Sequence, residues 1–477
     1  MKPLQIVLIS TYELGRQPFG LASPAAWLQA AGMSVSCQDL ALDAMEITLI
    51  EQADLVAFYL PMHTATRIAI PLLQRVREHN PQAHLCCYGL YAPLNESYLR
   101  NLGVDTILGG EFERGLVRLA EKLAASTQRG NTERALSLAT TRQTDDPNLP
   151  LISHERQHFL SPRRNGLPVL QRYATLDMGD GIQRTVGYTE ATRGCKHTCR
   201  HCPIVPVYEG HFRVVQRAVV LADIRNQVAA GAQHITFGDP DFFNGPGHAM
   251  SIVEALHNEF PDLTYDVTIK VEHLLQHQAL LPKLKATGCL FITSAVEAVD
   301  DEILRLLAKG HTRAEFIAAV RLLQEIGLQL NPTFVAFTPW ITVDGYRDLL
   351  QLIAELDLID QITPIQYAIR LLVTAQSRLL TLPSIIALVH PFDEQALVYP
   401  WNHPDPAVDA LQERIIALVE QADRSGQSRR AIFAQVWSLT QEYLPLKPKG
   451  IEANRLLSIV AKEKERNLPK LSEPWYC

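Results

Sequence analysis

Residues 192–203 read TRGCKHTCRHCP, which places Cys195, Cys199 and Cys202 in a C-x3-C-x2-C spacing. The stretch directly follows an apolar run, residues 185–191, that we predict to be a β-strand. Three thiolates this close together suit a soft metal ion or an iron–sulfur cluster. The stretch therefore indicates a strand that ends in a metal-binding loop, and the neighbouring sequence can be interpreted from it.

The same strand opens a series in which short apolar runs alternate with helical patterns. This alternation predicts a parallel sheet whose strands are joined by crossover helices. The predicted strands are residues 185–191, 234–237, 263–269, 290–295, 328–337 and 362–369, and the predicted helices include 218–230, 248–259, 274–287, 313–326 and 346–356. Six units are fewer than the eight of a closed (β/α)8 barrel. We therefore predict a partial (β/α)6 barrel over residues 183–395, with a side opening for a bulky substrate.

Residues 1–125 carry a second, separate alternation. The predicted strands are 4–10, 33–38, 55–60, 84–89 and 106–108, and the helices include 65–79 and 113–124. This pattern predicts a doubly wound, Rossmann-like α/β domain. Ligands of such sheets lie beyond the carboxyl ends of the strands, which here are followed by the loops 11–20, 61–64, 89–93 and 109–111.

The remaining segments show no strand series. Residues 126–182 are polar and rich in turn residues, so we expect a linker and covering loops. Residues 396–470 predict a small helical region, with amphipathic helices at 406–422 and 429–443. Residues 471–477 form the tail. The overall expectation is an α/β protein with a helical C-terminal region.

Composition excludes several classes of protein. Of the 477 residues, 47% are hydrophobic and 20% charged, which is typical of a folded chain. The net charge of −7 provides no global positive field for nucleic acid or anionic lipid. No run approaches the ~18 apolar residues of a membrane span, and no secretory signal is recognisable. We therefore expect a cytoplasmic protein that acts on a small molecule, without a nucleic-acid or membrane partner.

The chain holds eight cysteines, too few for a disulfide scaffold at this length. Cys37, Cys86, Cys87 and Cys289 lie in or beside predicted strands, where we expect them to be buried as small apolar residues.

The cysteine spacing, directly after the first barrel strand, resembles the radical S-adenosylmethionine (SAM) superfamily. In that family three cysteines hold three irons of a [4Fe-4S] cluster, SAM binds the fourth iron, and one electron cleaves SAM to a 5'-deoxyadenosyl radical. The resemblance implies an enzyme with Cys195, Cys199 and Cys202 as cluster ligands. It also implies an electron donor of the flavodoxin or ferredoxin type.

A zinc site is the alternative interpretation of the same residues. Zinc usually takes four protein ligands, and His197 or His201 could supply the fourth beside the three thiolates. The chain would then be a non-catalytic zinc or iron–sulfur binding protein.

The resemblance also implies residues that bind SAM. His201 precedes the last cysteine, a position that packs near the adenine in the family. Gly238 and Asp239 follow the second barrel strand, where the family has a Gly-Gly-Glu-like motif. Glu297, followed by the segment 309–312, is similar to a G-V-E-S…K-G pattern whose glutamate contacts SAM, although alanine replaces both the glycine and the serine.

Further polar residues follow other predicted strands. Lys270, Glu272 and His273 follow the third strand, and Arg370 follows the sixth. Residues at the carboxyl ends of barrel strands face the barrel mouth. We therefore expect a polar rim for substrate or SAM, with Lys270 and Arg370 as cofactor-binding candidates.

A doubly wound domain before such a barrel resembles the cobalamin-binding class of the superfamily. The common D-x-H-x-x-G signature is absent from the loop 11–20, and His63 is the only histidine near that crevice. Two alternatives stay open: the domain binds cobalamin without a protein ligand, or it keeps the fold without the cofactor.

Several segments together resemble one radical SAM family, named for a Cys-Cys-Ala-Glu-Pro or Cys-selenocysteine-Ala-Glu-Pro tail. The segments are 201–203, 237–242, 268–273, 309–312, 332–334, 337–340 and 473–477. Here the tail stops at Cys477, the first cysteine of that pattern. Our hypothesis is that a selenocysteine codon was read as a stop, so that the natural chain continues beyond Cys477.

Overall fold

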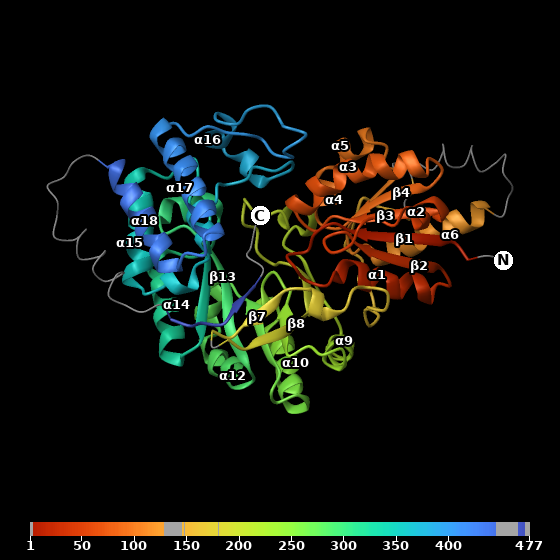
Figure 1. Cartoon of the computed structure of the whole chain (residues 1–477), viewed down its shortest axis with the longest axis horizontal. Helices are drawn as coiled ribbons and strands as arrows, with labels where there is room; N and C mark the ends of the chain where they lie inside the picture. Colours follow the sequence, from red (N-terminus) through yellow and green to blue (C-terminus); the bar gives the residue numbers. More distant parts are fainter. Residues whose placement is uncertain (1–2, 128–145, 147, 180, 445–465, 473–477) are drawn as a thin grey trace.

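Two α/β lobes lie side by side in the protein (Figure 1). The structure, a computed structural model, describes residues 3–127, 146, 148–179, 181–444 and 466–472. The N-terminal lobe is red to orange in Figure 1, and the second lobe runs from yellow through green to blue. The predicted tail cysteine, Cys477, lies outside the described residues.

The first lobe is a six-stranded parallel sheet in the order β2-β1-β3-β4-β5-β6. Its strands are β1 (Gln5–Ser10), β2 (Ser34–Asp39), β3 (Leu55–Tyr59), β4 (His84–Tyr88), β5 (Thr106–Gly110) and β6 (Ile152–Ser153). The five strands predicted for this domain are all present. The sixth, β6, comes from the segment expected to be linker, so that segment completes the edge of the sheet.

Helices cover both faces of this sheet because successive strand residues point to opposite faces. Ile6 and Leu8 of β1 pack in one buried cluster, whereas Val7 and Ile9 pack in the other. The helices are α1 (Phe19–Ala30), α2 (Ile47–Gln52), α3 (His63–His79), α4 (Tyr91–Leu94), α5 (Glu96–Asn101) and α6 (Glu113–Thr127). The two-sided burial confirms the doubly wound domain that the sequence predicts.

The second lobe is built on a seven-stranded sheet in the order β14-β13-β12-β11-β8-β7-β15. Its strands are β7 (Thr175–Asp177), β8 (Gln183–Thr189), β11 (His234–Phe237), β12 (Thr264–Thr268), β13 (Cys289–Glu297), β14 (Gln329–Phe334) and β15 (Lys470–Leu471). The strands β8 and β11 to β14 are parallel neighbours, and β7 and β15 add antiparallel edges. Five of the six predicted barrel strands are therefore confirmed.

The sixth predicted strand, residues 362–369, is wrong as a strand. The segment forms the 3-10 helix η6 (Pro364–Tyr367), and only a single bridge, between Phe337 and Arg370, continues the parallel sheet. Pro364 occupies the first turn of this 3-10 helix, where its fixed φ and its missing N–H are tolerated. The barrel remains partial, with five strands and one bridge.

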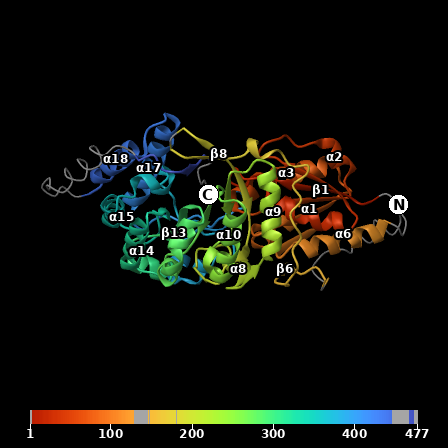
Figure 2. The same ribbon diagram turned by 90° about the horizontal axis from the view of Figure 1, so that it is seen from below.

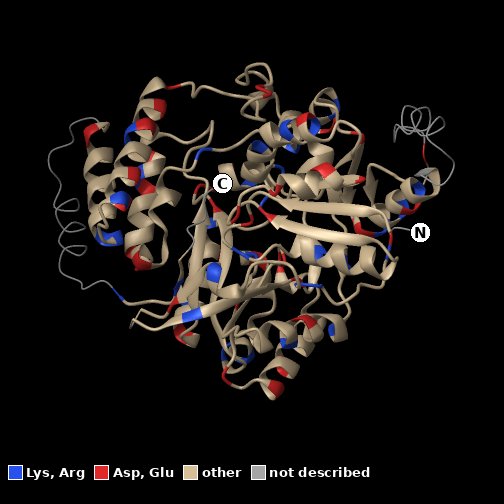
Figure 3. Cartoon of the chain, turned by 45° about the vertical axis from the view of Figure 1, so that its right-hand side comes forward, with Lys and Arg blue, Asp and Glu red and all other residues tan. Residues whose placement is uncertain are grey.

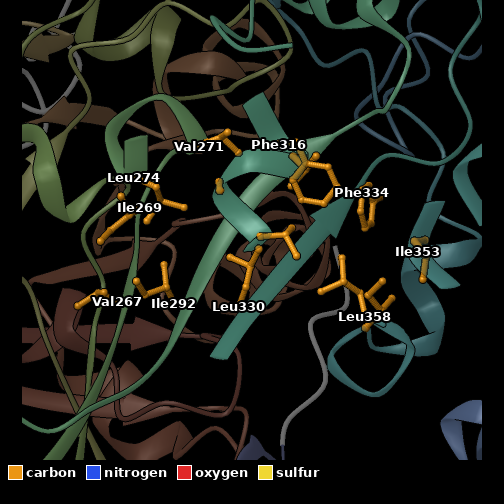
Figure 4. Close-up of a cluster of buried hydrophobic side chains, with 14 of the residues drawn as sticks. Val267, Ile269, Val271, Leu274, Ile292, Phe316, Leu330, Phe334, Ile353 and Leu358 are labelled. Atoms are coloured by element: carbon orange, nitrogen blue, oxygen red, sulfur yellow. The ribbon is translucent and has the colours of Figure 1, made fainter. Parts of the chain in front are cut away.

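Helices cover the outer face of the second sheet. They are α9 (Arg217–Ala229), α10 (Pro246–Glu259), α11 (Val271–Gln276), α12 (Leu281–Ala286), α13 (Asp301–Leu307), α14 (Arg313–Ile326) and α15 (Val343–Glu355). The predicted helix 274–287 is divided between α11 and α12, with Pro282 in the first turn of α12. Figure 2 shows α9 and α10 from below. Figure 4 shows Ile292 and Leu330 of the sheet near Phe316 of α14 and Ile353 of α15, in one buried cluster.

The C-terminal region contains the two predicted helices, α17 (Pro406–Arg424) and α18 (Arg429–Glu442). After them, β15 returns to pair antiparallel with β7. Among the described helices, none combines the length and apolarity that a bilayer crossing requires. Figure 3 shows acidic and basic residues interspersed over the helices of both lobes, with no face of a single sign in that view.

A buried charge cluster joins the two lobes. Arg193, in the short strand β9 (Thr192–Gly194), lies 2.7 Å from Glu113 and 3.7 Å from Glu111 of the first lobe, and 2.7 Å from Glu190. Arg193 is 6% exposed and Glu113 is 0% exposed. Burial raises the pKa of Glu111 to about 7, although Arg193 opposes the rise. The guanidinium of Arg193 thus forms ion pairs with three carboxylates directly before the cysteine loop.

We expect replacement of Arg193 to loosen both the lobe contact and the cysteine loop. Arg193→Met should lower the free energy of unfolding by about 3–5 kcal/mol, because removal of one partner leaves buried carboxylates without a counter-charge. Urea unfolding of the full chain measures this change. The control is Arg225→Met, which breaks an exposed pair with Glu259 and should change stability little. Equal effects of the two substitutions would contradict the structural role of Arg193.

Candidate functional site: the cysteine loop and the barrel cavity

The three cysteines lie in a loop closed by a short hairpin. Strand β9 pairs antiparallel with β10 (Phe212–Val214), and the loop between them contains all three cysteines. Gly194 has φ +74, and a Cβ at this position would lie 2.4 Å from the ring of Tyr208, so only glycine fits the entry to the loop. Cys195 and Cys199 are buried, Cys202 is half-buried, and all three are free thiols.

The thiols need a cation to become ligands. Burial raises the pKa of Cys195 to about 11 and that of Cys202 to about 12. A bound soft metal offsets this cost because it displaces the thiol protons. Buried thiols without disulfide partners, gathered in one loop, therefore fit a metal centre.

The number of protein ligands distinguishes a cluster from zinc. A structural zinc ion usually takes four. The histidines that could supply the fourth face carboxylates: Nε2 of His197 lies 3.4 Å from Asp241, and Nε2 of His201 lies 3.1 Å from Glu297. A set of three thiols therefore fits the iron–sulfur interpretation better than zinc.

His201 and Glu297, predicted separately, come together beside this loop. The Nε2 of His201 lies 3.1 Å from Oε1 of Glu297, and Nζ of Lys309 lies 3.3 Å from the same oxygen. Burial would raise the pKa of Glu297, but Lys309 and His201 bring it down to about 2. Glu297 therefore remains a carboxylate at the end of β13, next to the last cysteine of the motif.

Gly238 and Asp239 lie where the second barrel strand ends, as predicted. A Cβ at Gly238 would lie 1.8 Å from the hydroxyl of Tyr188, which excludes larger residues. Asp239 accepts hydrogen bonds from Oγ1 of Thr192, at 2.6 Å, and from the backbone N–H of Ala191, at 2.9 Å. Burial raises the pKa of Asp239 to about 7. Asp239 thus fastens the start of the cysteine loop and also lines the barrel cavity.

The remaining predicted residues divide into two groups. Lys270 is buried, lies 3.6 Å from Glu272 and lowers the pKa of Cys195, so it belongs to the cysteine side of the barrel. Arg370 has other partners. Its Nη1 donates to Asp409 at 2.6 Å, and its guanidinium stacks 3.5 Å from the ring centre of Trp401. These contacts tie Arg370 to the C-terminal region, and a role for it in cofactor binding stays a prediction.

A cavity of about 1030 Å³ occupies the interior of the barrel. Its walls are the inward-facing residues of successive strands, which alternate along each strand as pleated geometry requires. They include Thr236, Asp266, Thr268, Thr293, Asn331 and Thr333. Residues 469–472 line the cavity at β15, and Leu14, Gly15 and Arg16 line it from the first lobe. The lining combines polar side chains with apolar ones such as Val186, Phe237 and Phe291, and both the first lobe and β15 contribute to it.

The carboxyl edge of the first sheet bears on the two cobalamin alternatives. The rings of Tyr59, Tyr88 and Phe112 pack against one another there. The Nε2 of His63 is hydrogen-bonded to the carbonyl of Ala396 at 2.7 Å, so this nitrogen is engaged within the chain. Cobalamin bound without a histidine ligand and a fold kept without the cofactor are both consistent with this edge, and we derive no step through cobalamin.

Several residues of the site were not predicted from the sequence. Arg193 lies two positions before the first cysteine, yet its partners Glu111 and Glu113 belong to the other lobe. Asp241 lies in the segment 237–242, but no role was predicted for it, and it contacts His197 and His273. The sequence showed only that such residues follow predicted parallel strands. That position does not specify which side chains contact one another.

The second lobe is similar in sequence to a known family of proteins. Residues 189–354 match the family model of the radical SAM superfamily. The tRNA-2-methylthio-N(6)-dimethylallyladenosine synthase of Chloroflexus aurantiacus is 24% identical over 177 residues, which cover 34% of this chain and 37% of that protein. An uncharacterized methyltransferase of Pyrococcus horikoshii is 22% identical over 261 residues, 54% of either chain. The chain thus spans about a third to a half of the length of these curated relatives.

Solved structures share the two-lobe fold. The cobalamin-dependent S-adenosylmethionine radical enzyme OxsB, with aqua-cobalamin bound, superposes with a TM-score of 0.63 at 13% identity, covering 95% of this chain and 70% of that chain. The radical S-adenosylmethionine methyltransferase TsrM from Kitasatospora setae, with cobalamin and a [4Fe-4S] cluster bound, gives 0.57 at 17% identity, covering 74% and 70%. At these identities the likeness concerns the fold.

Proposed function

We propose that this chain, which carries a radical SAM superfamily domain over residues 189–354, is an enzyme that cleaves SAM reductively with a [4Fe-4S] cluster. Cys195, Cys199 and Cys202 would hold the cluster. The observation that carries the proposal is this trio of free thiols in one loop, two of them buried and one half-buried, beside histidines that face carboxylates. When bound, the cluster supplies the electron that converts SAM to methionine and a 5'-deoxyadenosyl radical.

The chain's own residues would bind and orient SAM. Glu297, held ionised by Lys309 and His201, offers a negative charge to the SAM amino group. Gly238 lines the cavity at the end of β11 and packs too closely against Tyr188 to carry a side chain, so it would offer backbone to SAM. His201 offers an imidazole edge next to the last cysteine. The surrounding barrel wall excludes water from the reaction.

The substrate we propose is a small polar molecule within the barrel cavity. Its volume, about 1030 Å³, is at the upper end of the range for small-ligand sites. Its lining carries acidic side chains, Asp239 and Asp266, and basic ones, Arg16 and Lys470, which suit a molecule with polar groups of either sign. Incubation with SAM, reductant and a metabolite extract would show which mass disappears.

We also propose a cytoplasmic location and a flavodoxin- or ferredoxin-type electron donor. The described cysteines are free thiols, and an oxygen-sensitive cluster requires the reducing conditions of that compartment. A low-potential carrier protein is the usual source of single electrons there.

Membership of the family with the Cys-Cys-Ala-Glu-Pro or Cys-selenocysteine-Ala-Glu-Pro tail is a further part of the proposal. It is supported by the motif segments of the barrel, among them 201–203, 237–242 and 268–273. Reading the codons after Cys477 tests it, because an in-frame UGA followed by Ala-Glu-Pro codons is expected and an ordinary UAA stop would refute the selenocysteine hypothesis.

Loss of the three cysteines should abolish both the cluster and the chemistry. The variant with Cys195, Cys199 and Cys202 replaced by alanine should retain no cluster iron after anaerobic reconstitution, and it should form no 5'-deoxyadenosine with dithionite and SAM. Iron analysis and chromatography measure both. The matched control is Cys289→Ala, a buried cysteine of β13 outside the loop, which should keep iron and turnover. A colourless wild-type protein that contains zinc would favour the non-catalytic alternative.

Removal of the Glu297 charge should weaken SAM binding but leave the cluster in place. Glu297→Gln should raise the KM for SAM about tenfold or more, since a charge-assisted hydrogen bond contributes on the order of 1.5–3 kcal/mol. Formation of 5'-deoxyadenosine against SAM concentration measures the change, with iron content as the check on the cluster. The control is Glu302→Gln, an exposed glutamate paired with Arg305. An unchanged KM in Glu297→Gln would remove this residue from the SAM site.

A further inference from the structure

A second group of ligand-type side chains lies beside the cysteine loop. His197 belongs to the loop itself, Asp241 follows β11, and His273 lies in α11 after β12. One ligand atom from each of the three lies within 4.8 Å of the others, and among the described residues this is the only such group of three. The group therefore joins three separate segments of the barrel mouth.

The converging atoms face one another and have no hydrogen-bond partner outside the group. Asp241 is 0% exposed and His273 is 1% exposed. The Nε2 of His197, Oδ2 of Asp241 and Nδ1 of His273 make no hydrogen bond of acceptable geometry. A buried polar atom without a partner is costly, so three of them directed at one point indicate a missing common partner.

The distances fit a shared cation. Ligand atoms bonded to one first-row ion at about 2.0–2.2 Å stand roughly 3.0–3.4 Å apart. The Nε2 of His197 lies 3.4 Å from Oδ2 of Asp241. The Nδ1 of His273 lies 2.6 Å from the same oxygen, so its ring would move outward by a few tenths of an ångström to admit an ion.

The surroundings hold Asp241 in position. Its other oxygen, Oδ1, accepts from the backbone N–H of Phe243 at 3.2 Å, which directs Oδ2 toward the imidazoles. The Nδ1 of His197 lies 3.7 Å from Oε2 of Glu272, within ion-pair range but beyond hydrogen-bond distance. Glu272 thus adds negative charge beside His197, which favours a bound cation.

We propose that His197, Asp241 and His273 bind a single first-row divalent cation, Zn²⁺ or Fe²⁺, separate from the cluster held by the cysteines. Two imidazoles and a carboxylate are donors that suit these ions, whereas the thiolates suit the cluster. The ion fastens the cysteine loop, through His197, to the ends of β11 and β12. The site stands independently of the proposed SAM chemistry.

Metal analysis of the full-length, cluster-loaded protein tests the site. Protein made with added Zn²⁺ should contain about one zinc per chain in addition to the cluster iron, and protein made with Fe²⁺ alone should contain one iron more than the cluster. Zinc-edge X-ray absorption should show nitrogen and oxygen ligands near 2.0–2.1 Å, rather than the sulfur shell near 2.3 Å that occupation of the cysteine loop would give.

Paired variants separate the site from adventitious metal. His273→Gln should lower the retained extra metal about tenfold or more, the scale expected when a ligand is lost. His277→Gln is the matched control, because its ring lies 5.7 Å from that of His273 but outside the ligand group, and it should retain the metal. Cluster iron, measured in the same samples, reports separately on the proposed enzyme.

Any of three results overturns the proposal. The cluster-loaded wild-type protein contains no extra metal, the bound zinc has only sulfur ligands, or the His273→Gln variant retains the extra ion. Where His273→Gln does not fold, the absorption spectrum of the wild-type protein alone decides between the nitrogen-oxygen site and the cysteines. If no sample contained extra metal, His197, Asp241 and His273 would form a hydrogen-bonded triplet and not a metal site.

Discussion

The cysteine loop depends on polar side chains that hold a segment with little regular structure of its own. Arg193 ties its start to the carboxylates of the first lobe, and Asp239 accepts from Thr192 and from the backbone of Ala191. Further along, the side chain of Asn244 accepts from the N–H of Lys196 and donates to the carbonyl of Gly194. Arg193 lies in β9, shortly after β8, whereas Asp239 and Asn244 follow β11, so the segments after two parallel strands position the loop.

The lobe contact gives the first domain a role that requires no ligand. Its strand-end carboxylates, Glu111 and Glu113, bind Arg193, and Gln157 donates to both. In addition, Val207 and Tyr208, which follow the last cysteine, pack in the buried cluster of the first lobe. The loop is therefore clamped between two domains, and a domain that resembles a cofactor carrier serves as one wall of the site.

Much of this architecture could be predicted from the sequence, because both sheets are parallel and their strands are short apolar runs. The spacing of the cysteines is local, so it too was visible. The pairing of Arg193 with Glu111 was not, because the two residues lie in separate lobes and no periodicity connects them. The predicted strand 362–369 was wrong because the segment that contains Pro364 forms a 3-10 helix. Arg370 occupies the predicted strand end, but Asp409 from the helical region engages its charge.

Charge balance explains why two lysines are buried at the barrel mouth. Three thiols that lose their protons on metal binding place negative charge in a region from which water is largely excluded, and an isolated buried charge is costly. Burial raises the pKa of Cys195 and of Cys202, and Lys270 and Lys309 respectively oppose that rise, so each lysine favours a thiolate. Lys309 also forms an ion pair with Glu297. Without these anions, the buried ammonium of Lys309 would itself be an unpaired charge that destabilises the fold. The buried cations and anions at this site are therefore mutually dependent, which requires the lysines, the glutamate and the cysteines to occur together.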